Sequence, residues 1–231
     1  MRSANKWNDL WRSMFDGYQK DLRNAYYLRS VLNSDEKNLL ELGAGSFRDM
    51  AELNRKGVNC TGVDFSDKSI ESAKKMFHQY GNLIYKMDIF NLNFSNKLFD
   101  ITFHNGLIGY FDNAKIEQIF IEQVRVTKKR MIITVHNAHN ENFKAYFEEK
   151  KKTDPLYDIR FFYKDEMEKL MKKHCVDVTI IPVGKAKKSY EDFLIKIGLG
   201  HPMLLRFLFK ISGHRLIHKS ERLMCIGTLA E

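Results

Sequence analysis

An alternation of apolar runs with amphipathic segments constrains the fold of this chain more than any other feature. Because strands that alternate with helices of this length form right-handed βαβ units, the pattern predicts an α/β fold with a doubly wound, mainly parallel sheet. Gly57 and Gly81 are expected to end the first two helices, and Asp67 to cap the start of the second. The strand-like runs are Asn38–Leu42, 58–63, 83–87, 99–103 and 130–135, and the helix-like segments are 47–56, 68–78 and 114–126.

The last third of the chain departs from this alternation. A helix is predicted over 164–173 and a strand over 175–183, whereas the last strand, 222–229, follows a long insertion, 184–221. At the other end, residues 5–32 carry aromatic side chains close to helical spacing, which indicates one or two amphipathic helices. The length of 231 residues and the lack of repeats or linkers favour one domain.

The positive charge of the chain is concentrated in the insertion. The formal net charge is +9, and residues 185–222 hold nine Lys and Arg against three Asp and Glu. Such a patch attracts anionic partners, although a solvated basic surface is the simpler alternative. Within it the apolar stretch 201–211, which carries Arg206 and Lys210, is too short and too charged to span a bilayer. A short core or cap helix and an interfacial helix that touches lipid both stay open.

The cysteines and the start of the chain indicate the compartment. Cys60, Cys175 and Cys225 are far apart and lie in apolar runs, so neither a disulfide framework nor a metal site is expected. The first residues, "MRSANKWNDLW", lack the apolar core of a signal peptide. The expected localisation is therefore cytoplasmic.

The stretch "LLELGAGSFRDM" marks a ligand site. In a doubly wound sheet, ligands bind beyond the carboxyl ends of the strands, where Gly43, Ala44 and Gly45 follow the first strand. Glycines there let the backbone approach a ligand closely, and the amides at the next helix start face anionic groups. Asp64 ends the second strand, 21 residues after Gly43, where a carboxylate can accept hydrogen bonds from ribose hydroxyls. This pattern predicts a nucleoside site.

Two ligands that contain adenosine are candidates for this turn. The dinucleotide fingerprint G-x-G-x-x-G needs a third glycine that lets the helix pack closely on the sheet, and Arg48 occupies that position. A large cation there disfavours NAD. The second candidate is S-adenosylmethionine.

The sequence around this turn resembles that of a known family. "NLLELGAGSFRDMAELNRKGVNCTGVDFSDKSIESAKK" is similar to the first motif region of class I S-adenosylmethionine-dependent methyltransferases of the small-molecule type, and "YKMDI" and "LFDITFHNGLIGYF" are similar to their third- and fourth-strand motifs. The resemblance covers about residues 38–136. It implies a Rossmann-like, seven-stranded sheet with an antiparallel last strand, with S-adenosyl-L-methionine as cofactor and S-adenosyl-L-homocysteine as product. Phe47 departs from the family pattern, which has a third glycine there, so the ring is expected to pack on the core or at the rim of the pocket.

The resemblance also implies roles for individual residues. Gly43, Ala44 and Gly45 would lie near the methionine portion, with Glu41 orienting the loop or binding the amino group indirectly. Asp64 would bind the ribose and Phe65 would flank the adenine. The third-strand residues Met87, Asp88 and Ile89 would lie at the adenine edge, and Asn105 and Gly106 would face the sulfonium.

The same resemblance divides the chain into functional segments. It implies an N-terminal helical lid over 1–36, in which Tyr18 would contact the cofactor, and a cofactor-binding core over 37–183. A helical basic insertion over 184–221 and the last strand over 222–231 would complete the domain.

Candidate catalytic residues follow from the chemistry of methyl transfer. Positioning supplies much of the rate in such an in-line displacement, and a base is needed only if the acceptor loses a proton. Many small-molecule members carry a histidine after the fourth strand, but this chain has "GLIGYF", with Tyr110, and tyrosine normally titrates near 10. Histidine can accept a proton at neutral pH. The preferred candidate base is His136, followed by His139 and Tyr110, and His104 is a further candidate. No nearby acid completes a metal site with the histidine pair.

The acceptor is predicted by class only. The aromatic lid and the stretch after the fourth strand favour an oxygen or nitrogen of a small or medium metabolite, including anionic, phosphorylated, surface-glycan and lipid-linked compounds. Nucleic acid is disfavoured because the amino-methylating Asn/Asp-Pro-Pro-Tyr motif and an RNA-binding module are missing. Two alternatives stay open: an RNA methyltransferase, and a non-catalytic S-adenosylmethionine-binding module. The basic C-terminal segment is also expected to contact a membrane surface peripherally, and no oligomeric state is predicted.

Overall fold

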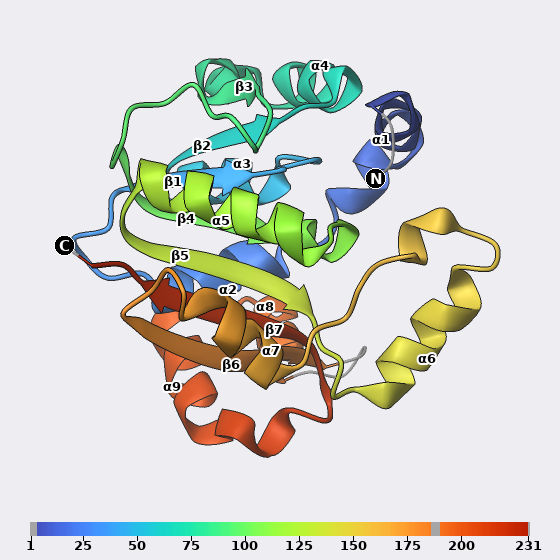
Figure 1. Cartoon of the computed structure of the whole chain (residues 1–231), viewed down its shortest axis with the longest axis vertical. Coiled ribbons are helices and arrows are strands. Elements are labelled where there is room, and N and C mark those ends of the chain that lie inside the picture. The colour runs from blue at the N-terminus through green and yellow to red at the C-terminus, as the bar shows by residue number, and fades with distance from the viewer. Residues whose placement is uncertain (1–3, 186–189, 231) are drawn as a thin grey trace.

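A seven-stranded sheet between helices forms the centre of the computed structural model, which describes residues 4–185 and 190–230 (Figure 1). The strand order is β3-β2-β1-β4-β5-β7-β6. Strands β1 to β5 pair in parallel, whereas β7 is antiparallel to both β5 and β6. The predicted fold class is thereby confirmed. The strands are β1 (Asn38–Leu42), β2 (Asn59–Asp64), β3 (Ile84–Lys86), β4 (Phe99–Asn105), β5 (Thr127–His136), β6 (Asp177–Lys185) and β7 (Ser220–Thr228).

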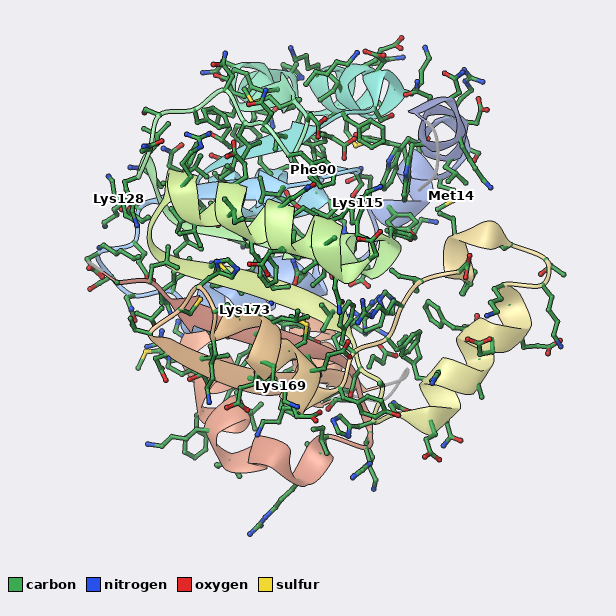
Figure 2. All side chains as sticks on the ribbon, in the orientation of Figure 1. Met14, Phe90, Lys115, Lys128, Lys169 and Lys173 are labelled. Carbon is green, nitrogen blue, oxygen red and sulfur yellow. The ribbon has the colours of Figure 1, made fainter. Side chains whose placement is uncertain are left out.

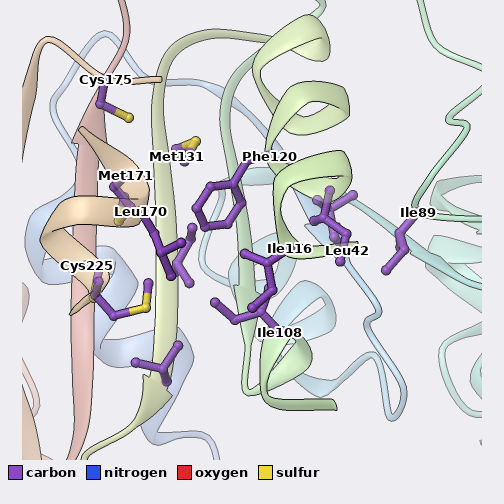
Figure 3. Packing of buried hydrophobic residues seen from close by; sticks show 14 of the residues in the cluster. Leu42, Ile89, Ile108, Ile116, Phe120, Met131, Leu170, Met171, Cys175 and Cys225 are labelled. Carbon is purple, nitrogen blue, oxygen red and sulfur yellow. The ribbon is translucent and has the colours of Figure 1, made fainter. Parts of the chain in front are cut away.

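Helices cover both faces of the sheet. One face carries α5 (Asn113–Val126) and α7 (Lys164–Met171), and the other carries α2 (Arg23–Val31), α3 (Arg48–Arg55), α4 (Asp67–Met76) and α9 (Pro202–Ser212). Burial on both faces explains why the parallel strands read as apolar runs. In β1, Leu42 belongs to the hydrophobic cluster beneath α5, together with Ile116 and Phe120 (Figure 3), whereas Leu39 belongs to the opposite cluster. Each fully buried side chain of this kind stabilises the fold by about 1.5–3 kcal/mol.

The structure corrects two predicted helix ends. Ser66, and not Asp67, caps the start of α4, because the Ser66 hydroxyl accepts the amide of Ser69 at 3.2 Å. Gly81 does not end a helix but lies within a 3₁₀ segment, whereas Gly57 follows α3 with a φ of +79°, as expected for a helix-ending glycine. The 3₁₀ segments are η1 (His78–Leu83), η2 (Leu107–Tyr110), η3 (Pro155–Tyr157) and η4 (Gly213–Leu216).

Two helices lie at the edge toward which the parallel strands point (Figure 1): α1 (Ala4–Tyr18) and α6 (Glu141–Lys150). The predicted helical region 5–32 forms α1 and α2. Helix α6 was not predicted, because none of its residues is buried and it has no core-facing stripe. Its signal in the sequence is the helical spacing of Phe143, Tyr146 and Phe147.

The insertion before the last strand is helical, as predicted. It contains α8 (Tyr190–Lys196) and α9, and residues 186–189 of the predicted 184–221 lie outside the described residues. The inner side of α9 packs on α2, where the rings of Tyr27 and Phe209 meet edge to face at 5.7 Å. Across residues 4–185 and 190–230, no helix has the length and apolar character needed to cross a membrane.

Candidate active site

A cavity of about 460 Å³ lies at the carboxyl edge of the parallel strands. This volume falls in the range that holds small molecules and cofactors. Its walls come from segments far apart in the chain, such as Met14 of α1 and Phe90 after β3 (Figure 2). Most of the residues that the sequence predicted for the site line this cavity: Tyr18, Glu41, Gly43, Ala44, Gly45, Asp64, Phe65, Asp88, Ile89, Asn105, Gly106, Tyr110 and His136.

The glycine turn after β1 has a conformation that depends on its glycines. Gly43 and Gly45 have φ values of +57° and +55°, in the left-handed region that strains other residues. The amide of Ala44 donates to the carbonyl of Val63 at 2.9 Å, and the amide of Gly45 donates to the Asp64 carboxylate at 2.9 Å. These bonds fasten the turn to the end of β2 and leave its other side facing the cavity.

Phe47 packs in the core and not at the rim of the cavity. Its side chain is fully buried, and its φ of +54° keeps the left-handed backbone for which the family uses glycine. The room for the ring comes from Gly62 in β2, where a Cβ would lie 2.7 Å from the ring atoms of Phe47. A glycine on the facing strand thus compensates for the glycine missing from the turn.

Two buried carboxylates lie beside this turn. Glu41 accepts the amide of Met50 at 3.0 Å, which ties β1 to the first turn of α3. Asp49 accepts the side-chain amide of Asn24 at 2.8 Å through Oδ2, while its Oδ1 is buried without a hydrogen-bond partner among the described residues. Burial and, for Glu41, the charge of Asp49 raise the pKa of both carboxyls. A cationic amino group in the cavity would favour the ionised form of both carboxyls and so lower their pKa values.

The carboxylate of Asp64 is held in place at the end of β2. It accepts the amides of Gly45 and Ser66, each at 2.9 Å, and burial raises its pKa to about 6. Two backbone bonds fix the carboxylate orientation, and each oxygen keeps a further lone pair for a ligand hydroxyl. Beside it Phe65 is 39% exposed and offers a ring face at the rim.

The loop after β3 completes this half of the cavity. Asp88 is exposed and accepts the amide of Phe90 at 3.0 Å, while Ile89 is buried against the core. Met87 does not line the cavity, although the family resemblance implied a role for it. Met87 packs instead against the hydrophobic cluster beneath α5.

Helix α1 is fastened over the glycine turn. The indole of Trp11 lies so close to Gly45 that a Cβ there would be 2.2 Å from the ring. After the helix, the side chain of Gln19 donates to the carbonyl of Ser46 at 2.9 Å, and the guanidinium of Arg48 donates to the carbonyl of Tyr18. Helix α1 and the residues that follow it therefore have specific contacts with the glycine turn.

His136 reaches the cavity from the end of β5. Its ring stacks on Phe143 with centroids 6.1 Å apart, and its Nδ1 is buried without a hydrogen-bond partner among the described residues. A Cβ built on Gly106 would lie 3.6 Å from Cε1 of His136, so the imidazole is adjacent to the turn after β4. Burial, and then the charge of Arg222, hold the pKa of His136 well below 6.5. The ring is therefore neutral at neutral pH.

The other candidate bases have different surroundings. His139 lies outside the cavity, because the chain turns after β5 and its Nε2 accepts the amide of Lys164 at the start of α7, at 3.1 Å. His104 is buried within the sheet and does not line the cavity, and desolvation lowers its pKa to about 3. Tyr110 lines the cavity, but its hydroxyl donates to the carbonyl of Leu156 at 3.4 Å.

The structure adds residues that the sequence reasoning did not single out. Arg222 begins the apolar part of the last strand and lines the cavity, as do Phe147 from α6 and Tyr157 from η3. Arg222 was counted only as part of the basic segment. The signal that would have revealed it is a cation at the head of a buried strand, at the same sheet edge as the glycine turn.

Comparisons with known proteins agree with this geometry. Residues 40–135 match the family model of a methyltransferase domain. The chain is 30% identical over 93 residues to phosphoethanolamine N-methyltransferase 3 of Arabidopsis thaliana, which amounts to 39% of this chain and 19% of that protein. The chain thus spans about a fifth of the length of this curated relative.

Solved structures share the fold over nearly the whole chain. A methyltransferase of Thermotoga maritima, described as a possible histamine N-methyltransferase, superimposes with a TM-score of 0.65 at 19% identity, over 98% of this chain and 94% of that one. The plantazolicin methyltransferase BamL, solved with a desmethyl-plantazolicin analogue and S-adenosylhomocysteine, gives a TM-score of 0.66 at 16% identity, over 99% and 94%.

The matched domain contains the same glycine turn and strand ends that form one half of the cavity. It also contains the four parallel strands that hold this half in place, β1 to β4. The sequence match and the geometry thus coincide on these residues, which are similar to a methyltransferase domain.

Proposed function

We propose that this protein transfers a methyl group from S-adenosylmethionine to an oxygen or nitrogen atom of a small or medium-sized acceptor. The supporting observation is that one cavity joins the glycine turn after β1 to His136 at the end of β5. When bound, S-adenosylmethionine supplies an electrophilic methyl group and leaves as S-adenosylhomocysteine. Holding the two reactants in line contributes about 7–11 kcal/mol in favourable cases.

The residues of the donor half fit this cofactor. Gly43 and Gly45 line the cavity where the methionine portion would lie, and Oδ1 of Asp49, which has no hydrogen-bond partner among the described residues, is suited to accept a hydrogen bond from the amino group of the cofactor. Asp64 would bind the ribose hydroxyls, and Asp88 the adenine amino group, with Phe65 against the ring. All of these carboxylates line the cavity and would also attract a sulfonium cation.

His136 is the base that this geometry favours. It is neutral, adjacent to Gly106, and enclosed by aromatic rings that exclude water. In this role His136 accepts the proton that an acceptor hydroxyl or ammonium group gives up. Tyr110, whose hydroxyl donates to a carbonyl, would position the acceptor and not deprotonate it.

Binding and turnover test this proposal separately. Calorimetry should detect binding of S-adenosylmethionine by the wild type and its loss in Asp64→Ala, while Asp67→Ala, which removes a nearby exposed carboxylate, should bind normally. Equal binding by Asp64→Ala and the wild type would contradict the donor site. S-adenosylhomocysteine formed with any member of a metabolite library supports catalysis. Binding without any such product would instead support a non-catalytic module.

We also propose that α8 and α9 contact an anionic membrane surface, which suits a lipid-linked acceptor. On α9, Met203, Phe207 and Ile211 lie one turn apart and are 75%, 58% and 60% exposed. Lys196 of α8 and Lys210 of α9 are also exposed, and the sequence has no acidic residue from 193 to 220. Apolar side chains with basic neighbours suit a lipid interface, whereas a second copy of the same surface would bring like charges together.

Vesicle sedimentation tests this contact. The protein should bind vesicles of phosphatidylcholine with phosphatidylglycerol more strongly than phosphatidylcholine alone, and added salt should weaken binding. Phe207→Ser should reduce binding, whereas Ile121→Ser, on the exposed side of α5, should not. Equal binding of both variants, or a dimer in ultracentrifugation that Phe207→Ser disrupts, would overturn the proposal.

A further inference from the structure

The cavity has a second half whose chemistry differs from that of the donor half. The donor half has four carboxylates, those of Glu41, Asp49, Asp64 and Asp88, and one guanidinium, that of Arg48, which donates to the carbonyl of Tyr18. The far half presents the guanidinium of Arg222 among aromatic side chains. Three strand steps separate β1 from β7 in the sheet, which places Arg222 about 14 Å from the glycine turn along the sheet edge. This half therefore lies where an acceptor, and not the donor, would bind.

Arg222 and His136 face the same space. They are directly opposite each other in the antiparallel pairing of β5 with β7, so their side chains leave the same face of the sheet. At directly opposed positions the Cβ atoms are about 4.5–5.5 Å apart. A group bound by Arg222 is consequently within reach of the proposed base.

The charge of Glu221 attracts the Arg222 guanidinium, but no ion pair joins Arg222 to a carboxylate among the described residues. Its Nη1 is buried without a hydrogen-bond partner among the described residues. The neighbouring Glu221 is already in an ion pair with Arg23, at 3.2 Å. Asp154, the other charged residue of this half, accepts the amide of Leu156 at 2.9 Å. A buried guanidinium donor without a partner is costly, and a ligand oxyanion would supply the missing acceptor.

Aromatic rings form the rest of this half. Phe147 and Tyr157 line the cavity with ring centroids 4.9 Å apart. Phe143 and Phe161 pack against Phe147, with centroids 4.8 and 5.2 Å from the centroid of its ring. The guanidinium carbon of Arg222 lies 5.9 Å from the centroid of Phe143. Such a surface binds a flat or apolar body by area burial and ring stacking.

We propose that the acceptor of this enzyme carries an oxyanion, a carboxylate or a phosphate, that Arg222 binds in the cavity, with its apolar or aromatic body against Phe147 and Tyr157. This inference rests on the proposed function only in calling the ligand an acceptor. It also assigns Arg222 as the residue that selects the acceptor and directs its reacting group toward His136.

Binding of unreactive probes to the protein saturated with S-adenosylhomocysteine tests the inference. The probes are benzoate, phenyl phosphate, inorganic phosphate and the uncharged benzyl alcohol. Benzoate or phenyl phosphate should bind at least tenfold more tightly than benzyl alcohol, and phenyl phosphate more tightly than inorganic phosphate. Whichever of benzoate and phenyl phosphate binds more tightly shows whether Arg222 prefers a carboxylate or a phosphate. The nuclear magnetic resonance signals of the His136 ring should shift when it binds.

Variants separate Arg222 from other cations. Arg222→Met keeps a long apolar side chain and should weaken binding of the aromatic anions at least tenfold, while Arg215→Met, at an exposed position, should leave it unchanged. Affinity for S-adenosylhomocysteine should stay within about twofold in both variants, which also shows that they fold.

Four results would overturn the inference. They are absence of probe binding, benzyl alcohol binding as tightly as the anions, unchanged anion affinity in Arg222→Met, and loss of S-adenosylhomocysteine affinity in that variant with anion binding intact. The last would assign Arg222 to the donor. If the wild type binds the anions through Arg222 but does not bind S-adenosylmethionine, the proposed function fails and the anion site stands.

Discussion

The ring of Phe47 occupies the space that Gly62 leaves open, and a Cβ at Gly62 would lie 2.7 Å from Cδ1 and Cε1 of that ring. The two residues come from the turn after β1 and from the neighbouring strand β2. The contact is buried, so the ring cannot move toward solvent without opening the core. It explains how the chain keeps the backbone path of a glycine turn with a phenylalanine in it.

We expect Gly62→Ala to destabilise the protein by about 1–3 kcal/mol, the usual cost of an overpacked core. Gly81→Ala is the matched control, because a Cβ there meets nothing within 4 Å. Urea unfolding measures the free energy of unfolding of both variants. The double variant Phe47→Leu with Gly62→Ala should lose less free energy of unfolding than the sum of the losses in the two single variants. Additive losses, or a Gly62→Ala protein as stable as the wild type, would show that the contact is not tight.

Affinity for S-adenosylhomocysteine should rise with pH through the titration of Asp64. The ribose hydroxyls would donate to the ionised carboxylate, and burial places the pKa of Asp64 at about 6. The fraction of protein with an ionised Asp64, which is the form that binds, therefore increases about tenfold from pH 5 to pH 7. The unliganded fold has the opposite dependence. Asp64 binds its proton more tightly in the folded than in the unfolded chain, so its contribution to stability falls as pH rises from 3.8 to 6.

Calorimetry across this pH range measures the affinity, and Asp64→Asn is the critical variant. It should bind more weakly at pH 7 and lose most of the pH dependence. An unchanged slope in Asp64→Asn would assign the titration to another group, such as Glu41, whose pKa burial also raises.

Replacement of His136 should affect turnover more than binding. If it acts as the base, His136→Asn should lower kcat by about 10²- to 10⁴-fold with little change in the affinity for S-adenosylmethionine. His139→Asn, which alters a histidine outside the cavity, should have nearly normal kcat. Because the pKa of His136 lies well below 6.5, kcat should show no loss of activity near pH 6.5. Equal effects of the two variants would remove His136 from the mechanism.

Both tryptophans of the chain, Trp7 and Trp11, line the cavity, so intrinsic fluorescence should report on donor binding. We expect Trp11→Ala to loosen α1 from Gly45 and to increase the dissociation rate of S-adenosylhomocysteine about tenfold, a change of about 1.4 kcal/mol. Stopped-flow fluorescence measures the rate, with Ile121→Ala on α5 as control. An unchanged rate in Trp11→Ala would contradict the role of α1 as a lid.

The sequence by itself determined the fold class and which residues meet at the carboxyl edge of the sheet. Parallel strands end at one edge of a sheet, so residues that directly follow β1, β2 and β4 meet there, and Gly43, Asp64 and Asn105 all line the cavity. The seven strands could be predicted from the sequence, because apolar runs and helical spacing are properties of short segments. The position of Phe47 could not, because it depends on Gly62 in the neighbouring strand.

Only the tertiary structure decided the other half of the cavity. His136 and His139 are equivalent candidates in the sequence, but His136 is the last residue of β5 and faces the cavity, whereas His139 lies in the turn toward α7. Arg222 comes opposite His136 through the register of two antiparallel strands, and α6 adds Phe147 although its sequence has no core-facing stripe. Local patterns specify strands and turns, but strand register and the docking of an exposed helix depend on packing between distant segments.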